Sequence, residues 1–220
     1  MTNTISDLLE SAAERVVPVV RGIAGDQLAD PTPCAEYDVR ALTDHLFHVV
    51  VNFQELAAKR PADFSAVPHY TEGEGEGEGE GEGEGEGEGE GEGEGEGEGE
   101  GDWRARFADE TAALVKAWAA PGAEEGTTGA MGLPARTVGQ MVLGDLTVHA
   151  WDLARATGQE FTPEPVVVGE LERWLGEMAP MARKAGVFGE PFPLPAEGVS
   201  QFDRVLALTG RDPHWRASVA

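Results

Sequence analysis

Apolar residues recur every three or four positions along most of this chain, which is the period of an amphipathic α-helix. The pattern predicts five helical stretches, at about residues 4–25, 38–59, 102–122, 137–158 and 162–186. A Gly-rich connection before the fourth stretch suits a short hairpin, and the C-terminal tail reads as an extended Pro-rich segment followed by one short helix. No strand-like alternation competes with this pattern. The sequence therefore predicts an all-α protein whose four longest helices form a bundle.

Capping residues mark the expected helix ends. The expected N-terminal caps are Thr4 with Asp7, Asp38, Asp102, Thr137 and Thr162. Gly158 is the expected C-terminal cap of the fourth helix, because glycine readily adopts the left-handed conformation that ends a helix. Pro18 lies inside the first helix and is expected to kink it. These signals bound the helices independently of their apolar stripes.

Residues 72–101 interrupt the helical pattern with fifteen consecutive Glu-Gly dipeptides. Such a repeat has no apolar face to bury, repels itself and carries the backbone entropy of glycine, so we expect a disordered insert. A weak cation-binding role is the alternative interpretation. Because the closure entropy of a loop grows slowly with its length, residues 1–220 are expected to fold as a single domain around the insert.

Composition excludes several classes of partner. The formal net charge is −25, and the repeat contributes fifteen of the negative charges. Nucleic acids and anionic membranes attract basic patches, so neither is an expected partner. The chain shows neither a signal-peptide pattern nor a long apolar span, and its single cysteine, Cys34, allows no intramolecular disulfide. A cytoplasmic protein is expected, monomeric or homodimeric, with Cys34 as an inert loop thiol.

Three ionisable residues fall on the apolar face of the fourth predicted helix. Asp145 and His149 are four residues apart and lie one turn above the other in the middle of the stripe, with Asp152 inside its edge. A buried carboxylate costs several kcal/mol unless it is compensated. The compensation is either an ion pair or hydrogen bond, or a divalent metal. Asp152 could pair with Arg155 on the helix surface or orient His149 as an acceptor.

A metal requires a further ligand from another helix, and His45 is the best candidate. It lies at the edge of the second helix's apolar stripe, whereas His48 lies further round and is expected to face solvent. Two imidazoles and one carboxylate suit Zn²⁺, with Ni²⁺, Fe²⁺ or Mn²⁺ as alternatives, and leave coordination positions open. The alternative is a metal-free core in which Asp145 and His149 are a satisfied pair and His45 is a structural histidine.

Three motifs resemble a known family. They are "TPCAEYDVRALTDHLFHVV", "DLTVHAWDLARATGQ" and "LALTGRDPHW", and together they resemble the DinB-like metal-binding four-helix-bundle superfamily. The likeness is strongest to the metal-binding domain of mycothiol-dependent maleylpyruvate isomerase and to uncharacterised actinobacterial proteins in that branch. It covers nearly the whole chain apart from the repeat. It implies a four-helix bundle with an additional helix and a Pro-rich C-terminal segment.

The resemblance also implies a metal site and an activity class. By motif, the ligands of the divalent metal are His45, Asp145 and His149, and the metal is often zinc. The isomerase has Glu where this chain has the shorter Asp145. The implied activity is transfer or isomerisation that uses a low-molecular-weight thiol such as mycothiol, acting on an acceptor that the sequence does not identify. The alternative is a non-catalytic bundle that binds a metal or a small molecule.

Overall fold

The structure of the protein is a computed structural model that describes residues 3–71 and 102–217. The prediction of a disordered insert falls on residues 72–101, outside the described residues. The elements are α1 (Ile5–Arg21), the 3₁₀ turn η1 (Gly25–Gln27), α2 (Val39–Ala57), α3 (Trp103–Trp118), β1 (Thr127–Thr128), β2 (Leu133–Pro134), α4 (Ala135–Thr157), α5 (Pro165–Lys184) and α6 (Gln201–Leu208). The expected all-α class is confirmed, as is the short hairpin, whose strands β1 and β2 pair antiparallel.

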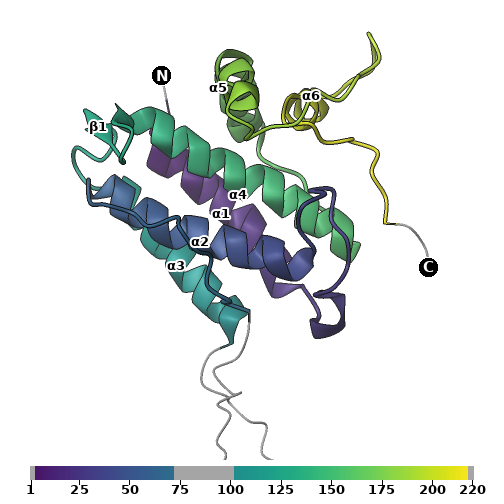
Figure 1. The fold of residues 1–220 in the computed structure, drawn as a ribbon, viewed down its shortest axis with the longest axis horizontal. Helices are drawn as coiled ribbons and strands as arrows, with labels where there is room; N and C mark the ends of the chain where they lie inside the picture. The colour runs from purple at the N-terminus through teal and green to yellow at the C-terminus, as the bar shows by residue number, and fades with distance from the viewer. Residues whose placement is uncertain (1–2, 72–101, 218–220) are drawn as a thin grey trace, which may run out of the picture.

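Helices α1 to α4 form the bundle (Figure 1). Each of α1 and α2 packs against both α3 and α4, so α1 lies diagonally across the bundle from α2. Helix α5 packs on α4 and α1, and α6 packs on α5, which places both helices outside the bundle beside α4. Among the described residues, no helix is both long and apolar enough to span a membrane.

Local capping explains most of the helix ends. Thr4 and Asp7 form a reciprocal capping box, and the side chains of Asp38 and Asp102 accept hydrogen bonds from the first turns of α2 and α3. Gly158 ends α4 at φ 71°, in the left-handed region. These predictions are confirmed. Pro18 lies within α1, which continues to Arg21.

The predicted caps Thr137 and Thr162 are wrong. Helix α4 begins two residues before Thr137, because the Ala135 amide donates to the Gly126 carbonyl at 3.0 Å and joins the helix directly to β2. Helix α5 begins at Pro165, after Glu164. A proline disfavours helical backbone at the preceding residue, so the second proline of "TPEP" determines the start.

Helices α4 and α2 are the two most enclosed helices of the bundle. Sixteen of the 23 residues of α4 are buried, compared with seven of 17 in α1. The bundle covers one side of α4, while α5 packs on another. Polar groups on several faces of α4 are therefore buried, not only those on the apolar stripe that the sequence shows.

Two glycines let the neighbours of α4 approach closely. At Gly139, an added Cβ would lie 2.7 Å from Cγ2 of Ile5 and 3.0 Å from Cζ3 of Trp118. Both neighbours are buried, and Ile5 is β-branched, so neither moves aside easily. At Gly144 the nearest atom, Cζ3 of Trp174, is 3.5 Å away, which is ordinary contact.

Substitution of these glycines tests the packing of α1 on α4. We expect Gly139→Ala to lower the free energy of unfolding by about 1–3 kcal/mol through overpacking. The matched control, Gly144→Ala, should leave it unchanged or raise it by about 0.5–1 kcal/mol, because alanine favours a helix. Urea unfolding followed by circular dichroism measures both. Equal effects of the two substitutions would contradict the close approach of Ile5 to Gly139.

Candidate metal centre

The packing of α2 on α4 brings His45, Asp145 and His149 together. One potential ligand atom from each residue lies within 4.8 Å of those of the other two. The Nε2 atom of His149 is 3.9 Å from Oδ1 of Asp145, and the His45 and His149 rings meet edge to face with centroids 5.2 Å apart. The three residues chosen from helical phase are therefore neighbours in the fold. Their role as metal ligands stays a prediction.

Burial affects the ionisation of two of these residues. Burial first, and then the charges of His149, His48 and Arg211, lower the pKa of His45 to about 4. His45 is therefore neutral at pH 7 and has a lone pair available for a metal. Burial raises the pKa of Asp145, while His149 and Arg211 counteract this effect, although a third of the Asp145 side chain remains exposed.

A buried carboxylate fixes the orientation of His149. Oδ2 of Asp152 lies 3.0 Å from Nδ1 of His149, and Asp152 has no exposed surface. Because a carboxylate can only accept, Nδ1 donates this hydrogen bond, and in the neutral imidazole that binds a metal the lone pair then lies on Nε2, the nitrogen nearer Asp145. The prediction that Asp152 orients His149 is confirmed as a contact. Asp152 is more deeply buried than Asp145, although the helical wheel places Asp145 in the middle of the apolar stripe and Asp152 at its edge. The reason is that α4 is enclosed on several sides.

The C-terminal tail supplies the charge that compensates Asp152. Nη2 of Arg211 donates to Oδ2 of Asp152 at 3.1 Å, so the ion-pair partner is Arg211 and not Arg155. Gly210, at φ 84°, turns the chain after α6, and the Arg211 amide then donates to the Leu206 carbonyl. The helical periodicity of α4 carries no signal for this partner, which lies 59 residues further along the chain.

The loop before α2 covers the other side of the site. The Tyr37 ring stacks on His45 with centroids 5.4 Å apart and planes 17° apart. The Thr32 hydroxyl holds this loop by hydrogen bonds to the carbonyls of Cys34 and Tyr37. Cys34 reaches the same region: its sulfur lies within 4.8 Å of a ring nitrogen of His149 and a carboxylate oxygen of Asp152. Burial raises the pKa of the Cys34 thiol, and the Arg211 charge opposes this rise.

The expectation that His48 faces solvent is wrong. Its side chain is buried, with Nδ1 3.1 Å from the Asn52 amide nitrogen and 3.4 Å from the Tyr70 hydroxyl. The segment that follows α2 folds back over this side of the helix: the Asp63 amide donates to Asn52, and the Thr71 amide donates to the buried Asp44. The position of a residue around its helix does not show this burial, because the segment that covers His48 lies outside the helix.

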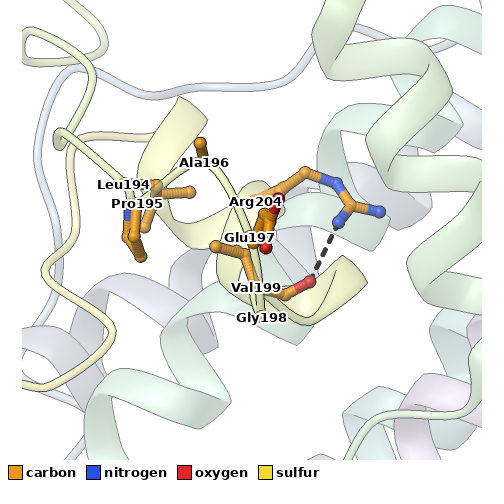
Figure 2. Close-up of a pocket in the computed structure, with 7 residues that line it drawn as sticks. All are labelled: Leu194, Pro195, Ala196, Glu197, Gly198, Val199 and Arg204. Carbon is orange, nitrogen blue, oxygen red and sulfur yellow. Dashed lines mark hydrogen bonds between the residues drawn. The ribbon is translucent and has the colours of Figure 1, made fainter.

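A surface hollow near the C-terminus is separate from this cluster. Residues 194–199 and Arg204 line it, and its volume is about 180 Å³ (Figure 2). Arg204 donates to the Val199 carbonyl and forms an ion pair with Glu172. Its charge is therefore already compensated, and the hollow holds none of the predicted site residues.

The donor set suits a divalent cation. Two imidazoles and one carboxylate are ordinary ligands of zinc and related metals, and three protein ligands leave further positions for water or substrate. The hydrogen bond from His149 to Asp152 is the kind of outer contact that metal-binding histidines usually make. Charge, ligand type and orientation therefore agree with a metal centre at His45, Asp145 and His149.

Comparison with known proteins finds one matching family and two similar proteins. The family model described as the mycothiol maleylpyruvate isomerase N-terminal domain matches residues 9–154. Two similar proteins of Mycobacterium tuberculosis are Uncharacterized protein MT0763 of strain CDC 1551 / Oshkosh and Uncharacterized protein Rv0738 of strain ATCC 25618 / H37Rv. Each is 27% identical over 211 residues, which cover 92% of this chain and 94% of the relative. No solved structure matches the chain.

The low pKa of His45 predicts a pH dependence of stability. In protein freed of metal by a chelator, the unfolded chain takes up a proton at this residue near pH 6.5, whereas the folded protein does so only near pH 4. We expect the free energy of unfolding to fall across this window as pH is lowered, by about 2–3 kcal/mol from His45. The raised pKa of Asp145 acts in the opposite direction in the same acid range.

Urea unfolding at a series of pH values measures this dependence, and His45→Gln is the comparison. The variant should lose most of the decrease between pH 6.5 and pH 4, because glutamine does not titrate. Identical slopes for the two proteins would show that His45 is not held neutral by its surroundings.

Proposed function

The chain belongs to the mycothiol maleylpyruvate isomerase N-terminal domain family, and on that premise we propose that it binds one divalent metal ion, preferably zinc. The bound metal serves a transfer or isomerisation reaction that uses a thiol. The thiol is a low-molecular-weight compound of the mycothiol type. We place this chemistry in the cytoplasm, where such thiols are kept reduced. The observation that carries the proposal is the convergence of His45, Asp145 and His149 from two adjacent helices.

The charges of the three residues favour an anionic ligand. His45 is neutral at pH 7, and Asp145 contributes one negative charge when a metal binds. Such a centre has a net charge of +1, and the open metal position would supply a Lewis acid that stabilises the thiolate, the reactive form of the thiol. A site with this charge prefers the thiolate to the neutral thiol.

The surrounding residues maintain the geometry of this centre. Asp152 accepts the Nδ1 hydrogen of His149 and keeps the Nε2 lone pair directed toward Asp145, while Arg211 compensates the charge of Asp152. Tyr37 covers one face of the His45 ring. These contacts orient the donor atoms before a metal binds, which lowers the entropic cost of binding.

Metal content tests the proposed ligands. We expect purified protein without an affinity tag, supplied with Zn²⁺, to bind one ion per chain at this site, and His149→Ala to lose it. Asp145→Asn should also lose the ion because the amide carries no charge, whereas Asp145→Glu should keep it. His214→Ala, at an exposed histidine of the tail, is the control. Elemental analysis after gel filtration gives the stoichiometry.

A second measurement separates metal binding from thiol chemistry. In protein loaded with Co²⁺, we expect mycothiol to change the visible spectrum as its sulfur enters the coordination sphere. Equal metal content in wild-type and His149→Ala protein would refute the ligand assignment. A metal-loaded protein whose spectrum ignores saturating thiol would refute the thiol chemistry and support a non-catalytic metal-binding bundle.

A further inference from the structure

Cys34, His149 and Asp152 form a second group of potential ligands. One potential ligand atom from each residue lies within 4.8 Å of those of the other two. This group shares His149 with the first, but its carboxylate lies at the other edge of the ring: Nε2 is 3.9 Å from Asp145, whereas Nδ1 is 3.0 Å from Asp152. Two ligand groups therefore meet at one imidazole.

One oxygen of the buried Asp152 carboxylate has no hydrogen-bond partner within residues 3–71 and 102–217. The Oδ2 atom accepts from both His149 and Arg211, but Oδ1 has no hydrogen-bond partner among the described residues. Asp152 is completely buried, so water does not satisfy this oxygen from the surface. A buried carboxylate oxygen without a partner is costly, and a cation beside it would remove that cost.

The three donors differ in chemistry from the first group. A thiolate replaces one of the two imidazole nitrogens, and soft sulfur ligands select thiophilic metals such as Cu⁺ over hard ions such as Mn²⁺. Arg211 remains bound to Oδ2 and leaves Oδ1 for coordination. It also compensates one of the two negative charges that Asp152 and the Cys34 thiolate bring to the group.

We propose that Cys34, His149 and Asp152 form a second metal site, which takes thiophilic cations and excludes occupation of the His45–Asp145–His149 site. When the cation binds, a sulfur–metal bond replaces the S–H bond of Cys34, and the proton passes to solvent. The Nδ1 proton of His149 moves to Nε2. A neutral imidazole has one lone pair, so His149 serves one site at a time. Thiophilic ions would thereby switch off the first site.

One part of this inference, that a cation at the second site excludes metal from the first site, rests on the proposed function. The second site itself can be tested alone. Cys34 is the only cysteine of the chain, so a sulfur-to-metal charge-transfer band can come from no other residue. Cd²⁺ is a suitable probe because it is thiophilic and its thiolate complexes absorb in the ultraviolet, whereas its carboxylate complexes with the Glu-Gly repeat lack a sulfur band.

The full chain is titrated with Cd²⁺, and the charge-transfer band is followed. The His149→Ala variant, which lacks a ligand of the proposed site, gives the background absorbance. We expect a band that saturates at one Cd²⁺ per chain, disappears in Cys34→Ser and persists in His45→Ala. Cys34→Ser should weaken Cd²⁺ binding at this site by at least about tenfold, because the loss of a mere outer contact to a ligand already costs roughly 10–100-fold in metal affinity. Circular dichroism verifies that the variants are folded, and the wild-type band by itself requires no variant.

Mn²⁺ binding, measured by its electron paramagnetic resonance signal, reports on the first site. We expect Cys34→Ser to bind Mn²⁺ as the wild type does, and wild-type protein loaded with Cd²⁺ to bind none at that site.

Cd²⁺ binding without a sulfur band, lost in His45→Ala, would overturn the second site and leave the proposed function intact. A sulfur band in His45→Ala together with no binding of Mn²⁺ or Zn²⁺ in Cys34→Ser would overturn the proposed function and support the second site. Simultaneous binding of both ions would overturn mutual exclusion.

Discussion

A carboxylate removed from water must be compensated, and Asp152 imposes this requirement on the centre of the molecule. The requirement is met from two directions: His149 donates from one turn earlier on α4, and Arg211 donates from the tail that follows α6. Removing either donor would leave a buried charge with less compensation, which typically costs several kcal/mol. This one side chain therefore ties the C-terminal segment to the bundle and sets the direction of the imidazole at the candidate metal centre.

The position of α4 makes this arrangement possible. Helices α1 and α2 pack on it within the bundle, and α5 packs on it from outside. Most of its surface is consequently buried, and polar residues on different faces face different neighbours. Asp145 and the Nε2 edge of His149 face α2 and His45, whereas Asp152 faces Cys34 and Arg211. One helix thereby serves two polar environments that share a single imidazole.

The family match and the candidate metal centre involve the same part of the molecule. The matched residues, 9–154, include all of α2 and the part of α4 that carries Asp145, His149 and Asp152. Arg211 lies beyond this range, although its guanidinium pairs with Asp152, the residue that orients His149. The electrostatics of the centre therefore depend on more of the chain than the family match covers. The half-buried Tyr37 and Cys34 complete the surroundings from the loop before α2.

The sequence by itself determined the all-α class, most helix ends and the three residues that converge, because helical period and capping are local properties of the chain. His45, Asp145 and His149 could be chosen from two helical wheels, since ligands four residues apart on one helix need only one further helix beside them. Local signals failed where distant segments intervened: the segment after α2 buries His48, the hairpin moves the start of α4, and Arg211 pairs with Asp152. Only the tertiary structure decided these features and brought Cys34 to His149, because burial and charge compensation depend on which segments pack together and not on their separation along the chain.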